Sequence, residues 1–471
     1  MSGRRGRGGR GVPPRGLPKS LVGRGRGLST PAAESNTSTV ASHVTTVGVK
    51  RSAFGSSGTE VKVFTNHFEV TIPQSIIHHY DVMVPSEQTL PSRLTMQIMH
   101  ALQTETAPEI FTPRAAYDGR KNLFSIRELP FTEGTHTFEV SLGPPVQGGK
   151  PSKAFKVTLK HVAVINPELL SRFLEGKQSH DNAVLTAITA LNVVVRMQPS
   201  LSYPFNVRSF FTPAETSDLG NGLILWRGYF QSIRPGIEKM LVNIDISTTA
   251  MFKPGPVKEL AKEFFYRSRR ITERDLSALS ARDRLQLQRF LYGVRVVTRM
   301  PNGQLSKVAR VLKRISDKGA RNHEFALREG GTMTVMAYFE KTYNRPLEFP
   351  DLPCVEVGTG ALIPMELCEI LPGQMMRKQI PPNKVKDVVR FSTKKPQDRL
   401  DSIRSAIGVL AYGESEYVRV SGQNKQSWTG TDFHVQEFGL TVDGQNPLLA
   451  PARVLDPPRL AYAGVSDPHR A

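Results

Sequence analysis

The order of strand-like and helix-like runs is the feature that most limits how this chain can fold. Alternating runs at 61–72, 123–142 and 154–164 come before the first long amphipathic run, and several strand-like runs follow one another after residue 292. Parallel sheets need a helix-length crossover between successive strands, and these spacings are too irregular for that. The sequence therefore predicts an α+β protein of several small modules and argues against a regular βαβ alternation.

Local signals place the individual elements. A helix is expected on the face shared by Leu94, Ile98 and Leu102, with Ser92 as its cap, and another over 181–196 that ends before Pro199. Ser280 and Asp283 resemble a capping box at the start of a further helix. Further helices are expected over 257–267 and 398–410, and further strands over 222–233, 240–247, 294–299, 307–315, 332–339, 353–357 and 362–370.

The net charge indicates the class of partner. Lysine and arginine number 62 against 42 acids in 471 residues, which gives +20, while 39% hydrophobic residues provide enough apolar material for folded cores. Such an excess favours a polyanionic partner, with nucleic acid ahead of an anionic membrane. The sequence has no uninterrupted apolar run of membrane-span length, so a membrane location is not expected.

The first 27 residues carry a large share of that charge. They contain seven arginines and Lys19 with no acid, so they contribute +8 and leave 20 − 8 = +12 for the rest of the chain. Glycine alternates with arginine and nothing is apolar enough to pack, so a disordered tail is predicted, continuing as a linker to residue 58. Such segments bind RNA with little sequence preference, and the alternative is a solubilising tail without a ligand.

Catalytic and metal-binding patterns are near-misses. The segment 143–152 resembles a phosphate-binding loop, but Gly149 stands at the lysine position and prolines replace amide donors, so a hairpin loop is the better interpretation. Cys354 and Cys368 lie in apolar contexts and are expected to be buried. Two cysteines make neither a disulfide framework nor a four-ligand zinc site, which favours a reducing compartment. The sequence predicts no cofactor, no metal and no catalytic site.

Aromatic and basic residues gather in the β-rich region. Phe325, Tyr338, Phe339 and Tyr343 lie between two basic groups. Strand alternation over 332–339 would place Tyr338 and Phe339 on opposite faces, so that one packs in the core and the other points into a cleft. Stacking surfaces beside cations are typical of RNA binding, and core aromatics beside a solvated basic face are the alternative. The basic groups are Arg295, Arg299, Lys307, Arg310, Lys313 and Arg314, then Arg377, Lys378, Lys384 and Lys386.

Three blocks of sequence resemble a known family in that family's order. The region 334–374, which contains TVMAYFEKTYNRPLEFPDLPCVEVG and ALIPMELCEILPGQ, resembles the PAZ domain of eukaryotic, fungal-like Argonautes. The preceding PFNVRSFFTPAETSDLGNGLILWRGYF resembles their first linker domain, and VKVFTNHFEV with YDGRKNLFSIRELPF resembles their N-terminal domain. A PAZ domain alone would also fit a Dicer, but the linker block argues against that family.

The resemblance implies a domain plan. It is a tail and linker over 1–58, an N-terminal domain over 59–165, a first linker domain over 166–290, an OB-like β-barrel PAZ domain over 291–395 and a second linker over 396–471. The chain stops where the MID and PIWI modules of Argonautes would begin. We therefore expect an amino-terminal half without the 5′-phosphate anchor or the slicer nuclease, and hence not an enzyme.

The resemblance also implies a site that anchors the 3′ end of a guide RNA. Phe325, Tyr338 and Tyr343 match the aromatics of that pocket, whose tyrosine hydroxyls hold the terminal phosphate. Lys307 matches a basic position, and Ile363 an apolar position beneath the terminal base. Two departures weaken the match. Ala309 stands where many relatives have tyrosine and Arg299 where they have histidine, so 3′-end affinity falls unless Arg299 or Arg310 compensates.

The implied function is small-RNA binding in RNA interference. Its partners would be a guide RNA and proteins of a silencing complex, in the cytoplasm and also in the nucleus. The alternative is a scaffold or decoy that engages protein partners through its linker surfaces, or RNA without specificity through the tail.

Overall fold

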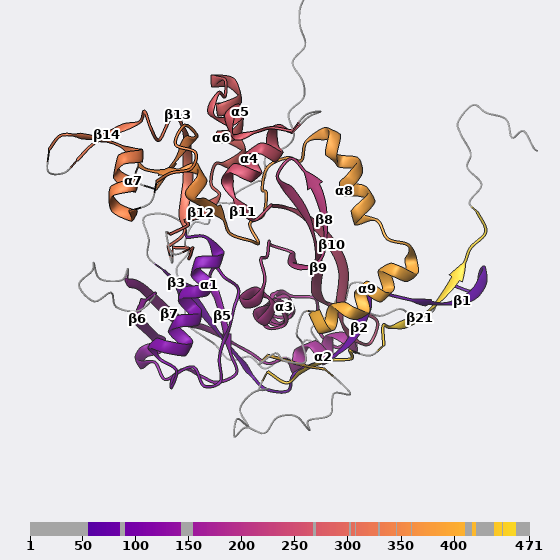
Figure 1. Ribbon diagram of the computed structural model, residues 1–471. Helices are drawn as coiled ribbons and strands as arrows, with labels where there is room; N and C mark the ends of the chain where they lie inside the picture. Colours follow the sequence, from indigo (N-terminus) through magenta and orange to yellow (C-terminus); the bar gives the residue numbers. More distant parts are fainter. Residues whose placement is uncertain are drawn as a thin grey trace, which may run out of the picture. The chain divides into compact units, whose positions relative to one another are not determined.

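The computed structural model describes residues 55–84, 90–142, 154–266, 270–300, 303–306, 308–327, 330–344, 346–358, 360–409, 417–420, 438–444 and 446–457 (Figure 1). The predicted disordered tail lies outside these residues up to position 54. Sheets and helices are mixed in every module, so the α+β prediction is confirmed.

The first module is a five-stranded antiparallel sheet in the order β4-β5-β3-β7-β6. Val157 and Leu159 are buried while Lys156 and Lys160 are exposed, which is the alternation expected of a half-buried strand. Strands β6 and β7 pair directly, as the hairpin interpretation requires, although the loop between them lies outside the described residues. The elements are β3 (Ile77–Met83), α1 (Ser92–Ala101), β4 (Ala116–Tyr117), β5 (Asn122–Ser125), β6 (Thr135–Ser141) and β7 (Ala154–Ile165).

The second module is a six-stranded sheet in the order β19-β20-β2-β10-β9-β8. Strands β1 and β21 form a separate two-stranded ribbon. The run predicted as one strand over 61–72 is split at Thr65 and Asn66, so that β1 and β2 enter different sheets. The elements are β1 (Thr59–Phe64), β2 (His67–Thr71), α2 (Glu168–Leu174), α3 (Asn182–Ser202), β8 (Ser209–Gly220), β9 (Leu223–Pro235), β10 (Met240–Phe252), β19 (Val418–Val420), β20 (Leu440–Val442) and β21 (Leu449–Val454).

Helix α3 corrects the predicted stop before Pro199. The helix begins at the Asp181 cap, whose carboxylate accepts a hydrogen bond from the Val184 amide at 2.9 Å, and continues through Pro199 to Ser202. Proline lacks the N–H that would bond the carbonyl four residues earlier. Here that carbonyl, Val195 O, accepts a hydrogen bond from the Gln231 side chain of β9 at 3.3 Å. Tertiary contact therefore compensates for the proline.

Helix α3 is also the most apolar helix described. With 21 residues and a mean hydropathy of 1.3 over an 18-residue window, it is long and apolar enough to cross a membrane, which the sequence inspection did not anticipate. Its buried residues, among them Val184, Leu191 and Val194, belong to the hydrophobic core shared with the first two sheets. The apolar face is therefore used inside the protein.

The third module is built on a sheet with the order β11-β18-β12-β13-β16-β17, and its outer strands β11 and β17 do not pair with each other among the described residues. A separate hairpin, β14–β15, carries helix α7. The elements are β11 (Gly255–Pro256), α4 (Val257–Phe265), α5 (Glu273–Ser277), α6 (Ala281–Leu291), β12 (Arg295–Thr298), β13 (Arg310–Gly319), β14 (Glu324–Ala326), β15 (Thr332–Thr334), α7 (Val335–Tyr343), β16 (Pro353–Val357), β17 (Ala361–Pro364) and β18 (Cys368–Ile370). Two helices follow this module in sequence, α8 (Val385–Ser392) and α9 (Pro396–Val409).

The helix caps in the structure confirm one predicted cap and contradict another, and they show where a predicted strand is a helix. Ser280 caps α6 as expected, because its hydroxyl accepts a hydrogen bond from the Asp283 amide at 3.1 Å. Ser92 does not cap α1, which follows Pro91 without a side-chain cap. The strand predicted over 332–339 is wrong, since only Thr332–Thr334 is extended. The Thr334 hydroxyl accepts from the Ala337 amide at 3.2 Å and starts α7 there.

Buried Arg227 fastens the segment that follows the third module to the second sheet. Its side chain is 1% exposed, and its guanidinium bonds Glu215 of β8 at 2.8 Å and the Phe391 carbonyl of α8 at 2.6 Å while lying 4.3 Å from the Phe391 ring centroid. Lys394 joins the same Glu215 carboxylate at 2.8 Å, and Arg399 of α9 pairs with Asp245 of β10. Helices α8 and α9 therefore run along β10, as Figure 1 shows.

Two glycines test the packing of this framework. A Cβ at Gly228 would lie 2.2 Å from the Phe210 carbonyl oxygen, so Gly228→Ala forces β8 and β9 apart and should reduce the free energy of unfolding by about 2 kcal/mol or more. Gly408 in α9 has open space around it, so Gly408→Ala should increase that free energy by about 0.5–1 kcal/mol. Urea unfolding of both variants measures the difference. Equal effects would contradict the register of β8 and β9.

The Arg227 contacts also predict a pH dependence. Partial burial raises the pKa of the Glu215 carboxyl, but the hydrogen bonds and charges of Arg227 and Lys394 outweigh it and hold the pKa below its ordinary value of 4.5. A depressed carboxyl pKa contributes stability above the unfolded value, and this contribution is lost as pH falls through the folded one. Glu215→Gln should therefore lower the midpoint of thermal unfolding at pH 7, and the difference from wild type should shrink below pH 4.5. A pH-independent difference would disprove this coupling.

Candidate nucleic-acid interface

A row of four aromatic rings joins β14 to α7. The Phe325 and Tyr338 ring centroids are 5.4 Å apart and edge to face, Tyr338 and Phe339 are 5.6 Å apart, and Phe339 stacks on Tyr343 at 5.3 Å. Consecutive helical residues point about 100° apart, so Tyr338 is 39% exposed while Phe339 is 6% exposed. The sequence prediction that one ring faces out and the other packs in the core is right, but helical geometry rather than strand alternation produces it. We call these four residues the aromatic row.

Strand pairing and backbone hydrogen bonds hold the aromatic row on the third module. The β14–β15 hairpin pairs Phe325 with Met333, and the turn between the strands contains Gly330 and Gly331, both at positive φ. The first turn of α7 is bound to the preceding chain, because the Val335 amide donates to His323 O at 2.9 Å and the Met336 amide to Ala320 O at 2.9 Å. Figure 1 shows α7 next to this hairpin. The aromatic row is therefore held at Phe325 by the hairpin and at the start of α7 by two backbone hydrogen bonds.

Cations lie on the strand that leads into the row. Four basic side chains of β13 are exposed, and the strand continues into Ala320, which contacts α7. Lys313 Nζ lies 5.6 Å from the Tyr292 ring centroid, the distance of a cation–π contact. The surface can pair with phosphates while the row offers ring faces and hydroxyl groups. The four residues are Arg310, Lys313, Arg314 and Lys318.

The remaining predicted site residues differ in their exposure and in their contacts. Arg310 is exposed, but Arg299 forms an ion pair with Glu369 of β18, so its charge is already partnered. Ile363 is 3% exposed and pairs with Val355, so it supports the sheet from inside and presents almost no surface to a base, contrary to the implied contact. Ala309 is half-buried and brings no hydroxyl group. Lys307 lies outside the described residues.

Both cysteines are buried and free, as predicted. Burial raises the pKa of the Cys354 thiol to about 12, and it also raises the pKa of the Cys368 thiol. Thiols held in the neutral form at physiological pH are poor nucleophiles. In the described part of the chain, no three histidine, cysteine or acidic side chains are arranged to hold a metal ion.

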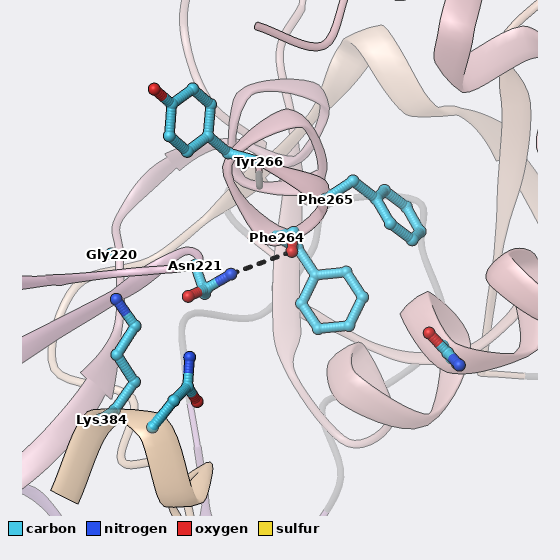
Figure 2. Close-up of a pocket in the computed structure, with 8 residues that line it drawn as sticks. Gly220, Asn221, Phe264, Phe265, Tyr266 and Lys384 are labelled. Atoms are coloured by element: carbon cyan, nitrogen blue, oxygen red, sulfur yellow. Dashed lines mark hydrogen bonds between the residues drawn. The ribbon is translucent and has the colours of Figure 1, made fainter. Parts of the chain in front are cut away.

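A concave site that the sequence inspection missed lies at the C-terminal end of α4. The cavity has a volume of about 650 Å³, and its wall includes Gly220, Asn221, Phe265, Tyr266 and Lys384 (Figure 2). The available signal in the sequence was the aromatic run at the end of α4. Three consecutive aromatic side chains on a helix point in different directions, so they cannot all pack into the protein core.

Comparison with known proteins agrees with these modules. Family models match the N-terminal domain of argonaute over residues 59–195, the Argonaute linker 1 domain over 207–253 and the PAZ domain over 263–387. The chain is 32% identical over 422 residues to protein argonaute MEL1 of Oryza sativa subsp. japonica, and 31% identical over 423 residues to protein argonaute 1D of the same plant. These matches take in 88% of this chain but 37% and 38% of those proteins.

A solved structure shares the fold. The crystal structure of Kluyveromyces polysporus Argonaute with a guide RNA superimposes with a TM-score of 0.57 at 15% identity, covering 87% of this chain and 47% of that one. The chain thus spans less than half the length of these relatives.

Two residues of the aromatic row, Phe339 and Tyr338, are expected to differ in how much they contribute to the free energy of unfolding. Phe339→Ala removes a buried ring and should reduce the free energy of unfolding by about 3–5 kcal/mol. Tyr338→Ala loses only the edge-to-face contacts of an exposed ring and should cost about 1 kcal/mol or less. Chemical denaturation of the two variants measures both effects. A larger loss for Tyr338→Ala would mean that Tyr338 is a core residue and not part of a binding surface.

Proposed function

Because the chain belongs to the Argonaute family, we propose that it binds the 3′ end of a small RNA through the aromatic row of its PAZ module. The observation that carries the proposal is the exposed Tyr338 ring, held between Phe325 and the buried Phe339. A ring fixed by its neighbours offers a stacking face without the entropic cost of ordering it on binding.

The chemistry of the row suits a strand end. The hydroxyl groups of Tyr338 and Tyr343 can donate to phosphate oxygens, while a ring face accepts the last base. The exposed cations of β13 would neutralise the backbone phosphates that precede the end. Because Arg299 is paired with Glu369 and Ala309 lacks a hydroxyl group, Arg310 is the better candidate to compensate for the missing tyrosine.

The role of this chain would be to hold RNA in gene silencing. The matched domains are the N-terminal, linker and PAZ domains, which supports guide retention as the proposed role of residues 59–387. A guide RNA is the proposed partner, and a cytoplasmic location remains a prediction.

Binding to RNA with a free or a chemically blocked 3′ end tests the proposal. Fluorescence anisotropy of the full chain should give tighter binding of the free end. Tyr338→Ala should weaken that binding at least about fivefold, since stacking of one base on an aromatic side chain contributes about 1–3 kcal/mol. Phe64→Ala is the matched control, because it removes an exposed ring from β1 and should leave the affinity unchanged.

Two results would contradict the proposal. One is equal affinity for free and blocked ends. The other is loss of all RNA binding when residues 1–27 are deleted, with no effect of Tyr338→Ala and Tyr343→Ala together. That second result would favour non-specific binding by the arginine-rich tail.

A further inference from the structure

The cavity at the end of α4 is formed by parts of the chain that are far apart in sequence. The β8–β9 turn supplies Gly220 and Asn221, α4 and the residue after it supply Phe265 and Tyr266, and the turn before α8 supplies Lys384 (Figure 2). Its volume of about 650 Å³ lies within the usual range of small-ligand pockets. The Asn221 side chain donates to the Phe264 carbonyl at 3.2 Å and ties the turn to the helix end.

A lysine points into this cavity without a partner. Figure 2 shows Lys384 extending toward Gly220, where a Cβ would lie only 3.1 Å from the ammonium nitrogen, so glycine leaves room for the charge. Gly220 has a φ of +72°, which also favours glycine. Among the described residues, Lys384 Nζ has neither a hydrogen-bond acceptor nor an ion-pair partner, and no carboxylate lines the cavity.

The acidic residues next to the cavity-lining segments in sequence already form ion pairs with another lysine. Lys253 bonds Asp218 at 2.8 Å and Glu263 at 2.8 Å. Burial raises the pKa of the Asp218 carboxyl, but Lys253, the Gly220 amide and the charge of Lys384 hold that pKa below its usual value. Lys384 therefore remains available to an anion that enters the cavity.

The opposite side of the cavity is aromatic. Tyr266 is 56% exposed and follows directly after the last residue of α4. Behind it, Phe264 stacks on Phe290 of α6 with ring centroids 4.5 Å apart, which holds the helix end in place. An exposed ring on a rigid support is a surface on which a planar group can stack.

We propose that this cavity binds one nucleotide of the RNA strand, with a phosphate at Lys384 and a base stacked on Tyr266. The site is separate from the aromatic row, and the inference rests on the proposed function only in that an RNA strand is the ligand. A cation and an exposed ring, with the amide groups of Gln286 and Asn383 on the same wall, match the phosphate, the base face and the base edge of a nucleotide. Because Tyr266 is open to solvent, a continuous strand can enter and leave.

Salt titrations test the contact to phosphate. The full chain is titrated with a 3′-blocked single-stranded RNA of small-RNA length at several salt concentrations, which removes the contribution of end recognition. Lys384→Ala should weaken binding and reduce the slope of log K against log salt concentration by about 0.7, the value for one phosphate contact to a single strand. Tyr266→Ala should weaken binding at least about fivefold and leave the slope unchanged. Lys395→Ala is the matched control, because it removes the same charge from an exposed position between α8 and α9, outside the two basic groups, and should leave the slope unchanged.

The outcomes separate this inference from the proposed function. Normal binding by both Lys384→Ala and Tyr266→Ala overturns the nucleotide site, whatever the free-end preference shows. Equal slope changes for Lys384→Ala and Lys395→Ala overturn it as well, because a diffuse basic surface would then suffice. Competition by millimolar AMP that Lys384→Ala abolishes is expected of this site, whereas AMP binding that depends on Lys384 and leaves the RNA affinity unchanged would overturn the strand as the ligand in favour of a free nucleotide. Conversely, loss of free-end preference in Tyr338→Ala with an unchanged effect of Lys384→Ala is the result expected of two independent sites.

Discussion

The contacts of Arg227 hold together the two parts of the chain on either side of the PAZ module. A guanidinium that is almost fully buried is stable only when charge and hydrogen bonds compensate for its lost hydration. Glu215 of β8 and the Phe391 carbonyl of α8 supply them, so strands that precede the module and the helix that follows it share one charged centre. Removing the arginine would leave Glu215 with Lys394 alone and would remove the hydrogen bond that joins the Phe391 carbonyl of α8 to the sheet.

The PAZ module is consequently an insertion with both ends attached to the same sheet. At its start, Phe252 donates a backbone hydrogen bond to Gln374 at 2.9 Å, and at its end Met376 donates to Ala250 at 2.8 Å. Strand β11 then pairs with β18. Within this closed segment, Ala320 and His323 bind the first turn of α7, and the aromatic row is the surface that results. If the aromatic row binds an RNA end as proposed, a surface fixed in this way would do so without its own linkers having to order on binding.

Sequence reasoning identified the family and the fold class and singled out the four aromatic residues that the structure brings together, because hydrophobic periodicity and sequence motifs are local signals. It failed where distant contacts decide. Pro199 is tolerated because Gln231 bonds the carbonyl that the proline leaves free. The strand predicted through Tyr338 is a helix whose first turn bonds the distant Ala320 and His323 carbonyls in addition to its local Thr334 cap. The ion pair of Arg299 with Glu369, the burial of Ile363 and the cavity beside Lys384 depend on residues that lie far apart in the chain. Apart from the Thr334 cap and the aromatic run at the end of α4, these arrangements leave no pattern at short spacing.

The central claim is that the aromatic row contacts the RNA terminus itself. Crosslinking of the full chain to an RNA with one photoreactive base at its 3′ end, followed by peptide mapping, tests this most directly. The account predicts crosslinks at Phe325, Tyr338 or Tyr343, and predicts that the crosslinks disappear when the photoreactive base is moved to the 5′ end. Crosslinks confined to the first 27 residues, or the same pattern from both ends of the RNA, would contradict it.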